Sequence, residues 1–449
     1  MFLLVHGGRI IDPGQGMDEA GDVLIAGGRI VQAGGSIVAS QAEELDARGL
    51  IVCPGFVDLH CHLREPGLED KETVSTGTKA AARGGFTTVC CMANTDPPLD
   101  TPEAVAWLKQ QATKDGLIGV LPIGCISRGR RGVNLTNMAE LAEAGVVAFS
   151  DDGDPVASSY LMRRAMECSR DLGLPIIDHC EDKALSTGGI MNEGQLSAEL
   201  GLPGIPAAAE EVMIARDLIL AKLTSSRVHI AHVSSKGSVE LIRRAKEDGI
   251  PVTAEVTPHH LTLTEKRVAG GPPNRPFDSN AKVNPPLRTE ADVEALIKGL
   301  KDGVIDAIAT DHAPHTAADK DREPELAASG ISGFDTAFGC LMGPVHRGEI
   351  SLAQLISKLT CEPARVIGRG GELGTLKVGA PANVVVVDPD REWTVDSRSF
   401  ASKGKNTPYH GCRFKGKVMA TIANGRLVHV DDSLSCCPVS HDRTARGRG

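Results

Sequence analysis

Histidine and aspartate residues stand at the ends of short apolar runs in the middle of this 449-residue sequence. Because side chains alternate along a strand, His60 and His62 project to the same side of their run, and their imidazoles can share one metal ion. Cys61, between them, points the other way and is left out of the site. One histidine at a strand end is usually an ordinary core residue, but five run ends with the same chemistry indicate a site. These residues are His60 and His62, Asp151 and Asp152, His179, His232, and Asp311 with His312 and His315.

Imidazole and carboxylate ligands without a nearby set of cysteines are typical of Zn²⁺, with Mn²⁺, Co²⁺ and Fe²⁺ as alternatives. His179 and His232, on neighbouring runs, can hold a second ion. Two metals roughly 3.5–4 Å apart deprotonate a shared water at neutral pH. Asp311 can bind a metal through one carboxylate oxygen and carry a proton on the other. These residues predict hydrolysis of an unreactive bond, above all an amide, while His259 and His260 receive no role.

The elements that carry these residues alternate between apolar runs and stretches with helical spacing. Alternation of strand and helix predicts a parallel sheet, and eight such units over about 250 residues predict a (β/α)₈ barrel. In a barrel the carboxyl ends of the strands form the active face, so the polar run ends would meet there. An open doubly wound sheet would show a glycine-rich phosphate turn after its first strand, and HCHLREPG is not one. The eight runs are 56–63, 87–92, 119–126, 145–153, 174–182, 227–234, 251–260 and 306–315.

The two ends of the chain differ from the middle in their pattern of apolar residues and glycines. In residues 1–55, short apolar runs interrupted by glycines predict antiparallel strands. Similar runs are found in residues 366–430. We therefore predict one small β-sandwich domain built from both ends around a catalytic barrel at 56–365. The polar stretch 431–449 is predicted to be a disordered tail.

The composition excludes several classes of protein. Hydrophobic residues make up 41% and charged residues 24%, as in ordinary globular domains. Aromatic residues are few (9 Phe, 2 Trp and 2 Tyr), which favours a core of aliphatic side chains. The net charge of −10 argues against a nucleic-acid-binding protein. No run is long enough to span a membrane and no signal peptide begins the chain, so we expect a cytoplasmic protein. Its 12 scattered cysteines, with no CxxC pair, fit reduced core residues.

Seven sequence blocks, found in order along the chain, are similar to those of one enzyme family. Together they resemble the class I, bacterial-type dihydroorotases of the amidohydrolase superfamily, and the resemblance extends from about residue 2 to 430. The blocks are DLHCHLREPG (58–67), MANTDP (92–97), FSDDG (149–153), GLPGIPAAAE (201–210), AHVSSKGS (231–238), KVNPPLR (282–288) and ATDHAPH (309–315).

This resemblance implies a metal centre with two Zn²⁺ ions per chain. His60 and His62 would bind one ion with Asp311, and His179 and His232 would bind the other. Asp152 and a hydroxide would bridge the two ions; the choice of Asp152 over Asp151 rests on the family spacing to His179. Hydantoinases, dihydropyrimidinases and allantoinases generally bridge with a carbamylated lysine from the fourth strand. The run 145–153 contains no lysine, which favours dihydroorotase.

The resemblance also implies a reaction, the reversible cyclisation of N-carbamoyl-L-aspartate to L-dihydroorotate with loss of water, in pyrimidine biosynthesis. A bridging metal hydroxide would open the ring, with Asp311 as general acid and base. An ionised Asp311 suits hydrolysis and a protonated one suits ring closure, so the favoured direction should change with pH. Arg64, a planar cation just after the two histidines, can bind the substrate carboxylate through two hydrogen bonds. The substrate-binding residues implied are His62, Arg64, Asn94, Asn284, His315, Ser329 and Gly330.

Two other functions fit parts of the sequence. One is a related cyclic amidase acting on hydantoin, dihydropyrimidine or allantoin. The other is an inactive dihydroorotase-like subunit that scaffolds aspartate carbamoyltransferase. Every expected ligand position is filled, so we predict an active enzyme on a small-molecule substrate. The family suggests a homodimer, and a complex with aspartate carbamoyltransferase stays open.

Overall fold

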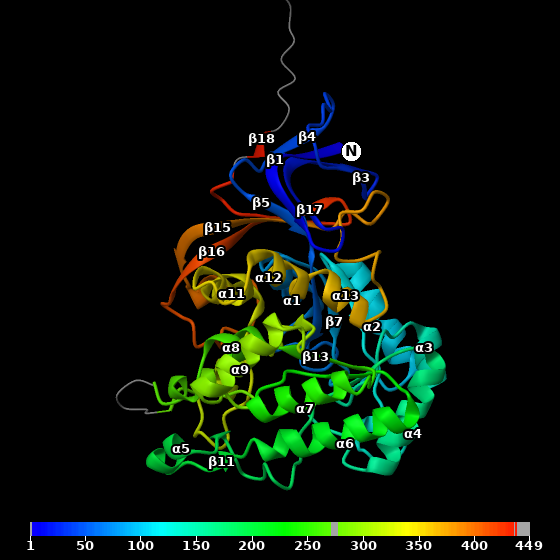
Figure 1. Cartoon of the computed structure of the whole chain (residues 1–449), viewed down its shortest axis with the longest axis vertical. Coiled ribbons are helices and arrows are strands. Elements are labelled where there is room, and N and C mark those ends of the chain that lie inside the picture. Colours follow the sequence, from blue (N-terminus) through cyan, green and yellow to red (C-terminus); the bar gives the residue numbers. More distant parts are fainter. Residues whose placement is uncertain (1, 271–276, 435, 438–449) are drawn as a thin grey trace, which may run out of the picture.

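The computed structural model describes residues 2–270, 277–434 and 436–437. It is a mixed α/β structure in which strands from both ends of the chain gather at one end of the long axis (Figure 1). The helices of the middle of the chain, among them α4 (Ser159–Leu172), α6 (Ala208–Thr224) and α7 (Lys236–Glu247), lie toward the other end (Figure 1).

The terminal strands form one sheet, in the order β17-β16-β15-β5-β1-β2-β3, with β4 paired to β1 and β18. β5 joins the two ends, because it pairs with β1 on one side and with β15 on the other. The predicted antiparallel arrangement holds for β1 to β3 and for the pairing of β5 with β15, but β4 and β5 run parallel to β1. The strands are β1 (Phe2–Asp12), β2 (Met17–Ala26), β3 (Arg29–Ala33), β4 (Glu43–Asp46), β5 (Ile51–Pro54), β15 (Val384–Thr394), β16 (Arg413–Ala423), β17 (Arg426–Val430) and β18 (Cys436–Cys437).

The middle of the chain forms parallel strands, as its alternating pattern predicts. β6, β7 and β8 pair in one group, and β9, β12, β13 and β14 in another. Phe149, in the predicted run 145–153, bridges in parallel to Gly124 beyond β8 and to Ile176 in β9. Cys61 in β6 bridges to His312, so the pairing leads from the last run back to the first. The strands are β6 (Phe56–Cys61), β7 (Phe86–Cys91), β8 (Gly119–Pro122), β9 (Ile176–Asp178), β12 (Val228–Ile230), β13 (Val252–Val256) and β14 (Ala307–Ile308), with the separate pair β10 (Met191–Asn192) and β11 (Gly204–Ile205).

Helices follow most of these strands and begin at residues that can cap them. The side chains of Thr101, Ser235 and Thr289 accept hydrogen bonds from first-turn amides of α2, α7 and α9. The remaining helices are α1 (Val74–Arg83), α2 (Pro102–Asp115), α3 (Met138–Ala144), α5 (Gln195–Leu200), α8 (Pro258–Thr262), α9 (Glu290–Lys301), α10 (Ala317–Lys320), α11 (Ala337–His346), α12 (Leu352–Leu359) and α13 (Cys361–Val366).

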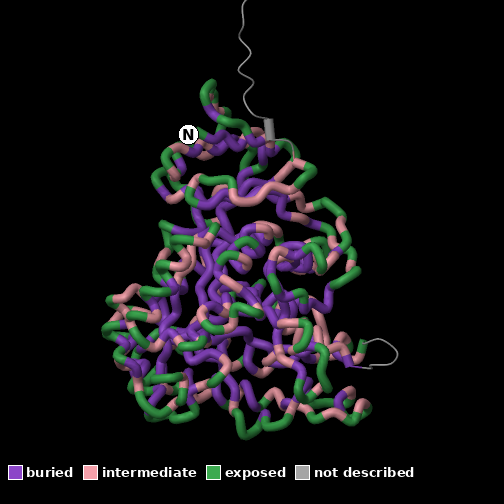
Figure 2. The backbone as a smooth tube through the Cα atoms, turned by 180° about the vertical axis from the view of Figure 1, so that it is seen from behind, coloured by how far each residue is buried: buried purple, intermediate pink, exposed green. Residues whose placement is uncertain are grey.

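Buried residues run through the interior from the terminal sheet to the parallel strands (Figure 2). Aliphatic side chains make up most of this core, and its few aromatics are concentrated: Phe56 packs edge-on against Phe86, with ring centroids 5.6 Å apart. The ten cysteines whose side chains are described are all free. Among the described residues, none of the helices combines the length and apolarity needed to cross a membrane.

The predicted tail is described only in part. Asp431 pairs with Lys417, and β18, within the same stretch, pairs with β4. Residues 438–449 lie outside the described residues, so the prediction of disorder for them stays a prediction.

Candidate metal centre

A buried carboxylate fixes the two segments that carry half of the predicted ligands. Asp58, on β6, accepts hydrogen bonds from the backbone amide of Thr310 and from its hydroxyl, both at 2.7 Å. Burial raises the pKa of Asp58 to about 7. This link holds β6 beside the segment that follows β14, so that His60 and Asp311 project from adjacent positions.

The first group of candidate ligands joins β6 to that segment. Nε2 of His62 lies 3.1 Å from Oδ1 of Asp311, and Nε2 of His60 lies 3.6 Å from the same oxygen. The ligand atoms of these three buried residues all lie within 4.8 Å of one another. The set predicted for one metal ion is therefore brought together.

Asp152 stands between the two predicted sets. Its Oδ1 lies 3.4 Å from Nε2 of His60, 3.6 Å from Nδ1 of His179 and 3.8 Å from Nε2 of His232. Its Oδ2 lies 3.6 Å from Nε2 of His62. The facing nitrogens of His179 and His232 are 2.9 Å apart. Asp152 thus faces all four histidines, as a bridging ligand must.

The buried atoms of this cluster fit divalent cations. Nε2 of His60 and Oδ1 of Asp152 are buried without a hydrogen-bond partner, an arrangement that is costly unless an ion binds there. Burial would raise the pKa of Asp152, but the charge of His60 and the nearby rings of His179 and His232 hold that pKa well below its usual range. Burial would lower the pKa of His179, but Asp152 and Glu181 raise it to about 9. The site therefore demands positive charge, which metal ions can supply.

Three site residues have a backbone conformation that side chains other than glycine rarely adopt. The φ angles are 64° at Arg64, 33° at His232 and 44° at Asp311. Such conformations cost about 1–3 kcal/mol each and persist where surrounding structure enforces them, often at functional sites. Here they turn the chain at the carboxyl ends of strands, where these side chains enter the cavity.

A cavity of about 240 Å³ opens over this cluster. Its lining includes Asp152, His179, His232 and Asp311 from the candidate metal centre. The structure therefore brings the predicted substrate-binding residues to the same place as the predicted ligands. Those lining it are His62, Arg64, Asn94, Asn284, His315, Ser329 and Gly330.

Arg64 is the cationic group of this cavity. Its Nη2 lies 3.3 Å from Nε2 of His315, which in turn lies 2.9 Å from the carbonyl oxygen of Ser329. Burial and the charge of Arg64 lower the pKa of His315 to about 2, so this ring is neutral and can donate to Ser329. Asn94, predicted beside the substrate carboxylate, contacts the metal centre: its Oδ1 faces Nδ1 of His62 at 2.9 Å.

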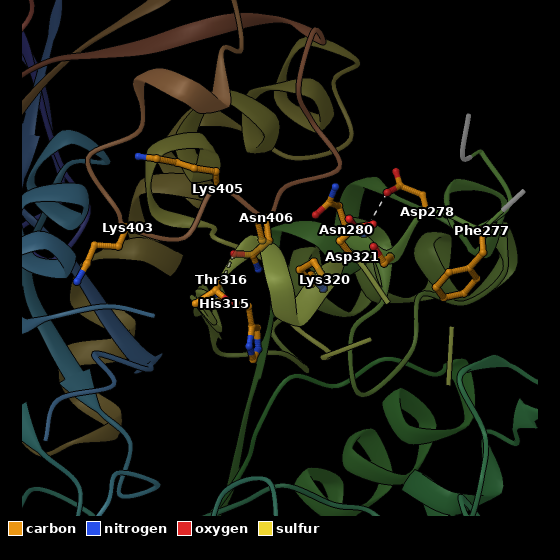
Figure 3. A pocket seen from close by; sticks show the side chains of 12 residues that line it. Phe277, Asp278, Asn280, His315, Thr316, Lys320, Asp321, Lys403, Lys405 and Asn406 are labelled. Carbon is orange, nitrogen blue, oxygen red and sulfur yellow. Dashed lines mark hydrogen bonds between the residues drawn. The ribbon is translucent and has the colours of Figure 1, made fainter. Parts of the chain in front are cut away.

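Figure 3 shows a larger, neighbouring cavity of about 560 Å³ that shares His315 with the first. Its lining also includes Lys320, Lys403, Lys405 and Asn406, and it contains none of the candidate metal ligands. We therefore assign the candidate reaction site to the smaller cavity. The cluster beneath it contains the buried atoms without a hydrogen-bond partner, Nε2 of His60 and Oδ1 of Asp152.

Two residues named with the polar run ends do not join the cluster. The carboxylate of Asp151 accepts hydrogen bonds from the amides of Ile126 and Ser127, which makes it a structural residue. His312 stacks on Phe334, with centroids 4.1 Å apart, and its Nε2 faces Glu72. Both side chains are held outside the cluster by these contacts, whereas their neighbours in sequence, Asp152 and Asp311, line the cavity.

The unassigned pair His259 and His260 lies in α8, and both side chains are buried. His260 is held by the hydroxyl of Thr257 at 2.8 Å and by the carbonyl of Pro285 at 3.0 Å. Neither histidine lines the smaller cavity.

Two glutamates that were not predicted from the sequence contact the ligands. Glu181 accepts hydrogen bonds from Nε2 of His179 at 3.0 Å and from Asn284 at 2.9 Å. Its position two residues after His179 is the signal that places it on the same side of the chain. Glu255, on β13, faces Nδ1 of His60 at 3.1 Å, and no sequence spacing links these two residues.

Comparison with known proteins gives a consistent result. A family model described as dihydro-orotase-like matches residues 49–238. The chain is 52% identical over 432 residues to a dihydroorotase of Pelotomaculum thermopropionicum, a match that covers 96% of this chain and 99% of that protein. It is 51% identical to a dihydroorotase of Caldanaerobacter subterraneus subsp. tengcongensis, over 95% of this chain and 97% of that protein.

Solved structures with a similar fold include cyclic amidases. The L-hydantoinase (dihydropyrimidinase) from Arthrobacter aurescens matches with a TM-score of 0.85 and 26% identity, over 97% of this chain and 98% of that one. The dihydropyrimidinase from Brevibacillus agri NCHU1002 matches with a TM-score of 0.83 and 24% identity, over 95% of both chains. The second likeness bears on the fold alone.

Proposed function

The chain belongs to the dihydroorotase family, and from this membership we propose that its cavity interconverts N-carbamoyl-L-aspartate and L-dihydroorotate. The proposal for the site rests on one observation: a cluster of four histidines and two aspartates lies at the same cavity as the half-buried side chain of Arg64. The cluster suits hydrolysis of a cyclic amide, and the guanidinium suits a substrate that carries a carboxylate.

We further propose that the parallel pairings from β6 to the segment after β14 form a (β/α)₈ barrel of the amidohydrolase type, and that the terminal sheet is its small β-sandwich domain. Two Zn²⁺ ions would be held at the carboxyl ends of the strands. His60, His62 and Asp311 would bind one, His179 and His232 the other, and Asp152 both.

Metal ions held by these residues would supply hydroxide at neutral pH and polarise the amide carbonyl. Burial would raise the pKa of Asp311, but the hydrogen bond from His62 and the charge of His60 bring it below its usual range, so the carboxylate is ionised at neutral pH. Asp311 then accepts the proton of the attacking water and delivers it to the ring nitrogen that leaves. In ring closure the same carboxylate starts protonated, and the ureido nitrogen attacks the side-chain carboxyl as water leaves.

Gly330 provides a prediction about the wall of the cavity. Its φ is +139°, and an added Cβ would lie 2.7 Å from Cβ of Ala313 and 2.8 Å from its carbonyl oxygen. Strain of about 1–3 kcal/mol would displace the loop, so Gly330→Ala should lower kcat/KM for dihydroorotate by about 10-fold or more. Gly333→Ala is the matched control, because φ is −96° and the nearest atom lies 3.5 Å away. Equal kinetics for the two variants would contradict this role of Gly330.

For the assembly we propose a homodimer that works in the cytoplasm. The outward side of α6 supports a protein interface, because Val212, Ile219 and Leu223 are each at least half exposed there (50%, 67% and 61%). Light scattering after size-exclusion chromatography measures the mass of the particle. Repeating it with aspartate carbamoyltransferase added tests for a complex with that enzyme.

The experiment that tests the function is a dihydroorotate ring-opening assay beside metal analysis of the same sample. We expect turnover in both directions and about two metal ions per chain. Hydantoin, dihydrouracil and allantoin complete the panel, and faster hydrolysis of any of them would indicate a related cyclic amidase. Less than one metal per chain, with no activity after Zn²⁺ is restored, would indicate a scaffold subunit.

A further inference from the structure

A series of buried polar side chains in contact with one another extends from His60, on the side of this residue that faces away from the cavity. Nδ1 of His60 lies 3.1 Å from Oε1 of Glu255, and Oε2 of Glu255 lies 3.1 Å from Nε2 of His229. Nδ1 of His229 lies 2.8 Å from the hydroxyl of Thr253, its register partner on β13. The side chains of His229 and Glu255 have no exposed surface, and that of His60 is 1% exposed.

The carboxylate of Glu255 determines which nitrogen of each neighbouring imidazole carries the ring proton. An ionised glutamate only accepts hydrogen bonds, so each ring donates from the nitrogen that faces it. With one proton on the ring, Nδ1 of His229 is an acceptor and the hydroxyl of Thr253 can donate to it. His60 donates from Nδ1, which leaves the lone pair of its Nε2 directed at Asp152 and Asp311. This is the tautomer that a metal ligand needs.

Glu255 differs from the groups behind the other ligand rings. Nδ1 of His62 faces the amide oxygen of Asn94, which accepts a hydrogen bond but carries no charge. Nε2 of His179 faces Glu181, whose charge is shared with Lys183 at 2.7 Å. Glu255 contacts two imidazoles and, among the described residues, forms no ion pair with a lysine or arginine. Its negative charge therefore acts on His60 and, through that ring, would act on an ion bound there.

We propose that Glu255 is a positioning residue of the metal centre: it fixes the tautomer and orientation of His60 and strengthens that ring as a ligand, while His229 and Thr253 hold Glu255 in place. The proposal rests on the metal site described under the proposed function.

Glu255→Gln separates this role from simple packing. Glutamine has nearly the same shape, but it offers one acceptor oxygen and one donor amide where the carboxylate offers two acceptors. Whichever ring faces the amide must give up its proton on that side. If this ring is His60, the proton moves to Nε2 and blocks the metal. If it is His229, His60 keeps its tautomer but loses the negative charge behind it.

The experiment measures metal binding, so it does not depend on turnover. The apo forms of wild type, Glu255→Gln and Glu255→Asp are titrated with Zn²⁺ against a chromophoric chelator, and the visible spectra of their Co²⁺ forms are recorded. We expect Glu255→Gln to weaken Zn²⁺ binding about 10- to 100-fold and to shift the Co²⁺ spectrum. Glu255→Asp, which keeps the charge, should lose less affinity than Glu255→Gln.

Asp22→Asn is the matched control. Asp22 is also a buried carboxylate, but it lies in the terminal sheet, where it accepts the amides of Gly7 and Ile37, and its substitution should leave Zn²⁺ affinity unchanged. Thr253→Val, which removes only the hydroxyl that holds His229, decides the question if Glu255→Gln does not fold, with an expected loss of several-fold. Wild-type affinity and spectrum in the folded variants would overturn the proposal. Wild-type protein that binds metal but does not turn over dihydroorotate would overturn the proposed function and leave this inference standing.

Discussion

Replacing Asp311 by asparagine is expected to abolish turnover while the protein remains folded. The side chain keeps its size and can still place an oxygen beside Nε2 of His62, 3.1 Å from Oδ1 of Asp311. It can no longer take up the proton of the attacking water or return one to the ring nitrogen. Loss of a general acid and base costs about 10²–10⁴-fold, and loss of a metal ligand adds to this. We therefore expect kcat to fall by about 10³-fold or more, measured in both reaction directions.

Asp306→Asn is the control for this change. Asp306 precedes β14 at its other end, where it pairs with Lys246 at 2.7 Å and accepts the amide of Ala254. Its substitution should lower the melting temperature slightly and leave kcat unchanged. Circular dichroism and metal analysis show whether Asp311→Asn is folded and loaded. If that variant retained more than a few per cent of kcat, Asp311 would not be the proton carrier.

The sequence predicted the parts of the site that depend on local geometry. The spacing of His60 and His62 on one strand requires that both rings face the same side, and the structure has them so, with Sγ of Cys61 turned toward the carbonyl of Cys90. The choice between Asp151 and Asp152 did not follow from alternation. The run that carries them forms no regular strand and is linked to its neighbours through single bridges at Phe149, so a period of two does not apply along it.

Features that depend on pairing between distant segments were not predictable from one sequence. Glu255, on β13 beside β12, contacts His60 because the folded chain brings β13 close to β6. Nothing in the spacing of residues 60 and 255 along the sequence predicts this contact. The parallel pairing of β4 and β5 with β1 was not predicted for a related reason. Apolar alternation tells which face of a strand is buried, but it is the same for parallel and antiparallel neighbours.

Arg64→Lys is expected to reduce selectivity for the substrate carboxylate. Lysine keeps the positive charge but loses the planar fork that binds two carboxylate oxygens at once. Arg64 is also held in place by the carbonyl of Pro314 at 3.3 Å and by a φ of 64°, so a flexible amine would not occupy the same position. A lost charged hydrogen bond is worth about 1.5–3 kcal/mol, so kcat/KM for dihydroorotate should fall about 10- to 100-fold, mainly through KM.

Dihydrouracil separates this effect from damage to the metal centre, because it has the same ring amide but no carboxylate. If Arg64 acts on the carboxylate, Arg64→Lys leaves the slow hydrolysis of dihydrouracil unchanged while dihydroorotate loses its advantage. Arg64→Met should lower dihydroorotate turnover further, because it also leaves the substrate anion without a cationic partner next to His315, a ring that burial and Arg64 keep neutral. An equal loss on both substrates would mean that Arg64 supports the metal ligands two residues before it. The ratio of the two kcat/KM values therefore shows whether this residue distinguishes a dihydroorotase from a general cyclic amidase.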